Sequence, residues 1–168
     1  MGQGARTATT ISVLGLLLVV GAVWGWSAVT DPLPEKVSTA VCVDRTVAEG
    51  DRVFPQDVTV SVYNAGNREG LAGRVMQELT DAGFHEGSSG NAAPTVRVPV
   101  VQIWTLEPAS PAVRLVASRL GRGVDVQRRE PVGHGVTVVV GDGFTELREG
   151  RKAVVARADA TICSPPVD

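Results

Sequence analysis

Apolar and polar residues alternate along residues 58–63, in the order Val-Thr-Val-Ser-Val-Tyr. A two-residue period of this kind is typical of a strand with one buried face. After a polar turn, the apolar residues recur at helical spacing and form one stripe, made of Leu71, Ala72, Val75, Leu79 and Ala82. The pattern predicts a helix over residues 69–82 that ends at Gly83 in a left-handed cap, with Phe84 folding back onto Leu79.

The same patterns along the rest of the chain predict one small α/β domain. A second helix is expected over residues 111–120, because Ser110 and Pro111 are typical of a helix start; Leu115 would point outward from it. The other strands are expected near residues 37–43, 96–103, 124–126, 136–140 and 153–163, and residues 85–94, rich in Gly, Ser, Ala and Asn, are expected to form a loop. Strand–helix–strand units predict a mixed sheet with both helices on one face.

Residues 11–29 contain no charged side chain and have the length of a membrane-spanning helix, which takes about 20 residues. Trp24 and Trp26 lie near its end, where aromatic rings prefer the membrane interface. The sequence therefore predicts a single-pass transmembrane anchor. The alternative is a cleaved secretory signal, which the length of the apolar run and the lack of an Ala-x-Ala cleavage site disfavour.

The residues that flank this run predict the orientation of the chain. Arg6 precedes the run and acidic residues follow it, which favours cytoplasmic residues 1–10 and an extracytoplasmic remainder. Residues 30–36 contain two prolines and are expected to form a stiff linker. The domain is then expected over residues 37–168, outside the cell membrane.

Cys42 and Cys163 are the only two cysteines of the chain. Each points away from the more apolar face of its predicted strand, so that two neighbouring strands can be joined through a disulfide. An extracytoplasmic compartment permits that bond, which would close nearly the whole domain. The alternative is a pair of free thiols; metal binding and thiol catalysis are disfavoured, because no C-x-x-C is present and the histidines are isolated.

Charge and motifs exclude several function classes. A net charge of −2 and an isoelectric point near 5.7 argue against a general nucleic-acid binder. No G-x-S-x-G or H-E-x-x-H motif is present, and neither His85 nor His134 has a nucleophile or carboxylate at a catalytic spacing. The sequence predicts no catalytic residue, metal site or cofactor.

The turn over residues 64–70 follows a strand and precedes a helix, a geometry in which backbone N–H groups can hold an anion. The residues that would form such a site are Asn64, Gly66, Asn67 and Gly70. The simpler interpretation is a helix start, with Asn64 or Asn67 as the N-cap residue. The sequence alone leaves both open.

Five arginines lie on the second predicted helix and shortly after it: Arg114, Arg119, Arg122, Arg128 and Arg129. Such a cluster can meet a phosphate-bearing wall polymer or anionic lipid head groups. A solvated charged face is the alternative.

The order of strand, turn 64–70, helix and Gly83–Phe84 resembles the LytR C-terminal domain, which usually shows V-x-V-x-N-G-S/T-G-x-x-G-L-A before a helix ending in G-F/Y. Residues 136–144, Val-Thr-Val-Val-Val-Gly-Asp-Gly-Phe, are similar to the closing motif of that family, so the resemblance covers residues 58–144. Ala65 and Asn67 stand where the family commonly has glycine; Asn tolerates left-handed backbone, so we expect the turn to persist. The resemblance implies a module of the Gram-positive cell envelope, found behind wall-polymer ligases of the LytR-CpsA-Psr type and also alone on small membrane-anchored proteins.

Together these features predict a non-catalytic, membrane-anchored cell-envelope protein that binds a protein partner or an anionic wall polymer. Two alternatives stay open. The chain is an accessory subunit of a LytR-CpsA-Psr ligase, or it is itself an enzyme of wall-polymer phosphotransfer. The enzyme interpretation is weaker, because in those ligases the catalytic domain precedes this module and the chain has no room for it.

Overall fold

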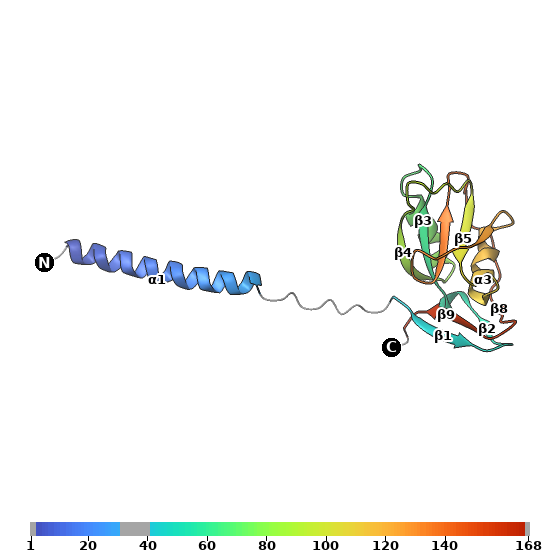
Figure 1. The fold of residues 1–168 in the computed structure, drawn as a ribbon, viewed down its shortest axis with the longest axis horizontal. Coiled ribbons are helices and arrows are strands. Elements are labelled where there is room, and N and C mark those ends of the chain that lie inside the picture. The colour runs from blue at the N-terminus through green and yellow to red at the C-terminus, as the bar shows by residue number, and fades with distance from the viewer. Residues whose placement is uncertain (1–2, 31–40, 167–168) are drawn as a thin grey trace. The chain divides into compact units, whose positions relative to one another are not determined.

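A computed structural model describes residues 3–30 and 41–166 of the chain (Figure 1). The chain divides into two units, residues 1–38 and 39–168, and each is described by itself. Residues 31–36 of the linker predicted over residues 30–36, and most of the strand predicted near residues 37–43, lie outside the described residues.

The described part of the first unit is the helix α1 (Gln3–Thr30), which includes the apolar run of residues 11–29. Its described side chains, over residues 11–26, are exposed. Within the described part of the chain no helix has the combination of length and apolar character that crossing a membrane requires, so the predicted transmembrane anchor is not supported.

The second unit is built on a five-stranded mixed sheet with the strand order β4-β3-β7-β5-β6. The central strand β7 pairs in parallel with β3 and antiparallel with β5, and the two outer pairs, β3–β4 and β5–β6, are parallel. The strands are β3 (Thr59–Asn64), β4 (His85–Asn91), β5 (Val101–Thr105), β6 (Asp125–Arg128) and β7 (Val136–Val140). The predicted α/β class and mixed sheet are confirmed.

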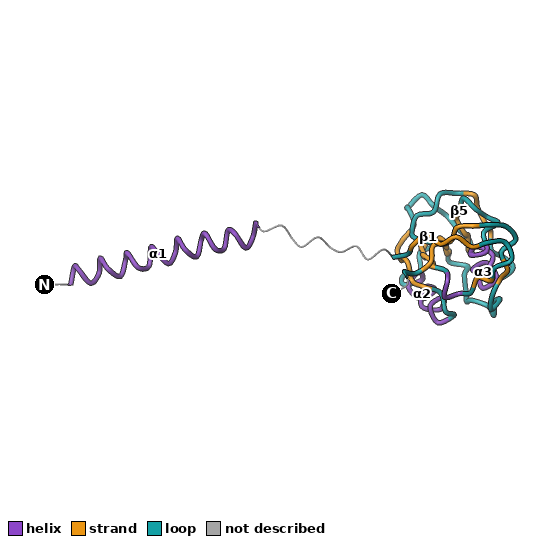
Figure 2. Tube along the Cα trace, turned by 90° about the horizontal axis from the view of Figure 1, so that it is seen from below, coloured by secondary structure: helices purple, strands orange, loops and turns teal. Residues whose placement is uncertain are grey.

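Two helices, α2 (Leu71–Asp81) and α3 (Pro111–Leu120), pack on one face of this sheet (Figure 2), as predicted. Every second residue of the central strands points to these helices and is buried in one cluster with them; examples are Val62, Ile103 and Val138, each 0% exposed. Burial of apolar area in such a cluster is the main source of stability for a domain of this size.

The opposite face of the sheet has a smaller apolar cluster in place of a helix. Trp104 and Val139 lie on this face and are covered by Val96 and Val98 from the segment before β5. Trp104 is 2% exposed, so it is a core residue, as expected of an aromatic ring at the end of an apolar strand. The strand predicted over residues 96–103 therefore begins only at Val101, because its first half crosses the sheet as a buried cover.

The C-terminal end of α2 has the predicted geometry. Gly83 has a φ of 93°, and its N–H donates to the carbonyl of Thr80 while the N–H of Phe84 donates to that of Leu79. These two hydrogen bonds define a Schellman motif. Phe84 and Leu79 are both buried, so the hydrophobic contact expected with this motif is also supported.

Two short antiparallel ribbons lie at one end of the sheet (Figure 1). One pairs β1 (Val43–Val47) with β9 (Ala160–Ser164), and the other pairs β2 (Arg52–Val53) with β8 (Val154–Val155). A single 3₁₀ turn, η1 (Pro55–Asp57), leads from β2 into β3. The strand predicted over residues 153–163 is thus divided between two ribbons.

The cysteines join the first ribbon as predicted. Cys42 and Cys163 form a disulfide, with 5.4 Å between their Cα atoms and 121 residues between them in sequence. Cys42 directly precedes β1 and Cys163 lies in β9, so the bridge joins the two strands of this ribbon near the start of one and the end of the other.

Two expectations about local structure are wrong. Residues 85–91 form the edge strand β4, where a loop was expected, because parallel pairing with β3 supplies hydrogen bonds that do not require apolar side chains. Leu115 is 0% exposed, where an outward position was expected, because α3 contacts the ribbon strands β2, β8 and β9 as well as the sheet.

We predict that replacing Cys42 or Cys163 with Ser lowers the melting temperature of the protein. A bridge that closes a loop of 121 residues stabilises a domain by on the order of 4–5 kcal/mol in the chain-entropy description. Thermal unfolding of the wild-type protein with and without reductant, beside both variants, measures the effect. Equal melting temperatures for oxidised, reduced and substituted protein would contradict this role of the bridge.

Candidate binding site

The turn between β3 and α2 holds an anion that the chain itself supplies. The N–H groups of Asn67 and Arg68 both donate to Oδ1 of Asp142, at 2.8 and 3.1 Å, and the Asn67 side-chain amide donates to Oδ2 at 3.3 Å. The N–H of Gly66 donates to the side chain of Asn64, whose amide in turn donates to the Arg68 carbonyl. In this turn the N–H groups of Gly66, Asn67 and Arg68 therefore already have internal acceptors.

The close approach of Asp142 explains the glycine at position 66. A Cβ atom on Gly66 would collide with the carboxylate and backbone N of Asp142. The N-cap residue of α2 is Gly70, which has a φ of 70° and makes no side-chain cap, so the expectation of Asn64 or Asn67 as N-cap is wrong. The side chains of both asparagines instead make hydrogen bonds within the turn and to Asp142.

The five predicted arginines do not form one cluster. Arg129 lies apart from the other four, because its guanidinium is 4.0 Å from the ring centroid of Trp104, on the sheet face that the helices do not cover. Arg119 packs against Gly150, and its Nε is buried without a hydrogen bond to any described residue. Arg122 is exposed in the turn after α3.

The other two, Arg114 of α3 and Arg128 of β6, meet at one pocket together with Arg157, which the sequence analysis did not select. We call it the arginine pocket. It has a volume of about 400 Å³, and its remaining lining comes mainly from the start of α3 and the turn before β9. Arg157 lies 29 residues beyond Arg128 in the sequence, and the two come together only in the folded domain, where the segment before β9 lies beside the start of α3.

The arginine pocket has an excess of positively charged side chains. Burial, and then the neighbouring guanidiniums of Arg157 and Arg151, lower the pKa of Arg114. Arg114 donates to the carbonyl of Val155 at 3.1 Å. The ion pairs among the described residues are Arg45–Asp57 and Arg74–Glu78, so none of the three pocket arginines is neutralised by a direct partner.

Two carboxylates also line the arginine pocket, those of Glu107 and Asp159. Asp159 accepts a hydrogen bond from the Glu49 N–H, which fixes it to the neighbouring loop at 2.9 Å. Three guanidiniums against two carboxylates leave the lining of this pocket with an excess of positive charge. Guanidiniums can pair with both oxygens of a carboxylate or phosphate.

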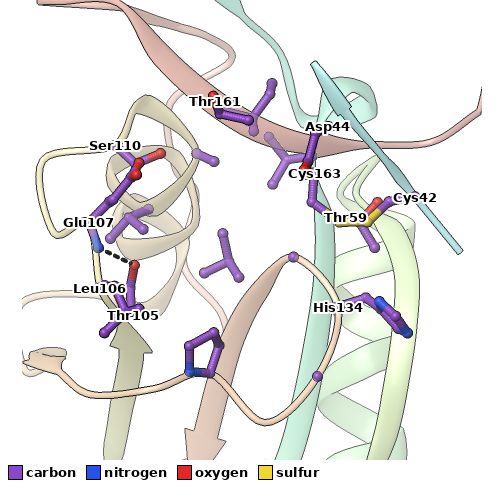
Figure 3. Close-up of a pocket in the computed structure, with 18 residues that line it drawn as sticks. Cys42, Asp44, Thr59, Thr105, Leu106, Glu107, Ser110, His134, Thr161 and Cys163 are labelled. Carbon is purple, nitrogen blue, oxygen red and sulfur yellow. Dashed lines mark hydrogen bonds between the residues drawn. A yellow bond between two sulfur atoms is a disulfide. The ribbon is translucent and has the colours of Figure 1, made fainter. Parts of the chain in front are cut away.

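A second pocket adjoins the arginine pocket, with which it shares Glu107 and Ser110, and is drawn in Figure 3. It has a volume of about 510 Å³ and lies between the β1–β9 ribbon, the start of α3 and the turn before β7. The disulfide forms part of its wall (Figure 3), as does the side chain of His134. We call it the ribbon pocket.

The other candidates for chemistry stay apart. His85 and His134 are both exposed, as expected, and they lie on different strands or turns. Within residues 3–30 and 41–166, no group of three or more His, Cys, Asp or Glu side chains is arranged to hold a metal ion.

Comparison with known proteins identifies the family of the chain. The model of the family described as LytR cell envelope-related transcriptional attenuator matches residues 57–144. This match covers more than half of the chain, which therefore belongs to the LytR C-terminal domain family. The match begins just before β3 and ends at Phe144, two residues after Asp142.

A solved structure is also similar to part of the chain: the soluble domain of a conserved hypothetical secreted protein from Mycobacterium marinum. The similarity covers 60% of this chain and 77% of that chain, with 23% sequence identity and a TM-score of 0.45. No curated protein matches the chain.

We predict that Asp142→Asn lowers the free energy of unfolding by about 1–3 kcal/mol, because the Asn67 and Arg68 N–H groups lose a charged acceptor. Urea unfolding of the wild-type protein and the variant measures the difference. Glu146→Gln, which removes a carboxylate of equal charge from an exposed position nearby, is the matched control and should leave the stability within about 0.5 kcal/mol. If both variants unfold like the wild type, the proposed closure of the turn is wrong.

Proposed function

We propose that this chain is a non-catalytic binding module of the cell envelope that recognises an anionic wall polymer through the arginine pocket. The observation that carries the proposal is the convergence of Arg114, Arg128 and Arg157 on one pocket without a direct ion-pair partner. Family membership supports the envelope as its place of action. An accessory role beside a wall-polymer ligase is compatible with the same site.

An extracytoplasmic location is supported by the disulfide. Cys42 and Cys163 are bonded, and such bonds persist in oxidising compartments and are rare in the cytosol. Both cysteines lie outside residues 57–144, so the bridge is a property of this chain in addition to the family module.

The geometry favours phosphate- or carboxylate-bearing polymers over a single small anion. Guanidiniums present planar forks of donors that match the two oxygens of a phosphate or carboxylate. The pocket is open and its arginines come from α3, β6 and the turn before β9, so consecutive charges of a chain can each meet a different arginine.

We predict that Arg157→Glu weakens binding of the full chain to isolated cell wall by about tenfold or more, because it reverses a charge inside the pocket. Co-sedimentation with cell wall, over a range of protein concentrations, measures the affinity. Arg122→Glu is the matched control, since it makes the same change in net charge at an exposed position outside the pocket. An equal loss in both variants would show that net charge, and not this pocket, governs binding; an unchanged affinity for Arg157→Glu would exclude the pocket.

We predict that Lys152, which is exposed in the domain, reacts in intact cells with an amine reagent that does not cross membranes. Mass spectrometry of the peptide that contains Lys152 measures the labelling, and Lys152→Arg is the control. Labelling only after lysis would place the domain in the cytoplasm and contradict the proposed location.

A further inference from the structure

The ribbon pocket has a fully buried hydroxyl that no described residue of the domain satisfies. Thr59, the first residue of β3, lines this pocket and is 0% exposed. Its Oγ1 makes no hydrogen bond to any described residue. A buried polar atom without a partner is disfavoured, so an ordered water, an ion or a ligand that donates to it would lower the free energy of the site.

The charge of the ribbon pocket is opposite to that of the arginine pocket. Its lining includes the carboxylates of Asp44 and Glu107 and no Arg or Lys side chain. Neither carboxylate takes part in an ion pair with a described residue. Figure 3 shows Asp44 and Thr59 on the side of the disulfide, and Glu107 on the side of α3.

The remaining wall of the ribbon pocket is partly apolar, with polar side chains from Thr105, Ser110, His134 and Thr161. Val58, Val113, Val136 and Ile162 are all buried, and the disulfide adds a further apolar surface. A volume of about 510 Å³ lies within the range of small-molecule sites, which are mostly apolar with a few polar groups that fix orientation.

We propose that the ribbon pocket binds an alkylammonium group, meaning a primary amine carried on an aliphatic body. The aliphatic body would lie against the valines and Ile162, and the three N–H donors of the ammonium would meet a carboxylate and Oγ1 of Thr59. Glu107 lines both pockets, but the ribbon pocket adds Asp44 and has no arginine to offset the two carboxylates, so it disfavours an anion. The ligand therefore differs in charge from the polymer proposed for the arginine pocket. The inference does not depend on the proposed function.

The test compares three probes of equal chain length: pentylamine, 1-pentanol and pentanoate. Titration of the ¹⁵N-labelled full chain, followed by amide chemical shifts, should give saturable shifts at residues 133–136 and 161–163, which line the ribbon pocket. Pentylamine is expected to bind at least fivefold more tightly than 1-pentanol, and pentanoate more weakly than both. Equal binding of the three probes, tightest binding of pentanoate, or no saturable shift at these residues would overturn the proposal.

Charge-neutral variants locate the ammonium. Asp44→Asn and Glu107→Gln remove the two carboxylates, and at least one of them should weaken pentylamine binding threefold or more while leaving 1-pentanol binding unchanged. Glu130→Gln, at an exposed position outside the pocket, is the matched control and should change neither. Unchanged pentylamine binding in both pocket variants would contradict the proposal.

Thr59→Val separates a binding role of this hydroxyl from a structural one. Valine keeps the shape of the side chain and removes the oxygen that has no partner, so the melting temperature should be equal to or higher than that of the wild type. Pentylamine binding should weaken at least threefold. A lower melting temperature, or pentylamine binding equal to that of the wild type, would show that Oγ1 does not serve the ligand.

A blocked lysine, Nα-acetyl-lysine methylamide, distinguishes the two sources of an alkylammonium. Tighter binding of the blocked lysine than of pentylamine would identify a lysine-type side chain of a peptide as the ligand, and the reverse order would identify a free amine. Failure of both to bind would overturn the inference while leaving the polymer-binding proposal to be judged by Arg157→Glu.

Discussion

The structure depends on one carboxylate. Asp142 accepts the N–H groups of Asn67 and Arg68 and so ties the turn after β3 to the segment after β7. These two strands are parallel neighbours, so their carboxyl ends lie at the same edge of the sheet. The segments that follow them therefore start side by side, and Asp142 joins them. The Arg68 guanidinium adds a hydrogen bond to the Phe144 carbonyl. The turn over residues 64–70 and the closing motif over residues 136–144 are thereby hydrogen-bonded to each other directly before the start of α2.

Sequence patterns predicted the parts of the fold whose partners are near in sequence or whose apolar period is regular. The helix over residues 111–120 and the strand over residues 136–140 have the predicted bounds, and the Gly83 cap is confirmed. The edge strand β4 was missed because its pairing with β3 rests on backbone hydrogen bonds, which leave no apolar pattern in the sequence. The pairing also contains a bulge, at which the Ser61 hydroxyl accepts the Ser88 N–H and donates to the His134 carbonyl. Leu115 was misplaced because sequence alone does not show that ribbons cover α3 from a second side.

The site residues show the same division. The disulfide followed from two isolated cysteines on predicted strands and is confirmed. The arginine cluster was only a run along the sequence, and the structure separates it: Arg129 stacks on Trp104, while Arg114 and Arg128 meet Arg157. Arg157, Thr59 and Asp44 carried no local signal, because their significance arises where distant segments meet. The closing motif with Asp142 did carry such a signal, in its position directly after an apolar strand.

Both pockets lie where the family module, residues 57–144, meets the ribbons that flank it in sequence. The lining of each pocket thus combines residues inside the matched range with residues outside it. The most direct measurement of the central claim is the salt dependence of full-chain binding to isolated cell wall. Recognition of an anionic polymer by arginines predicts tight binding at low salt that falls steeply as the Debye length shrinks from about 30 Å at 0.01 M to about 8 Å at 0.15 M. Binding that is unchanged by salt, or absent at both concentrations, would contradict it.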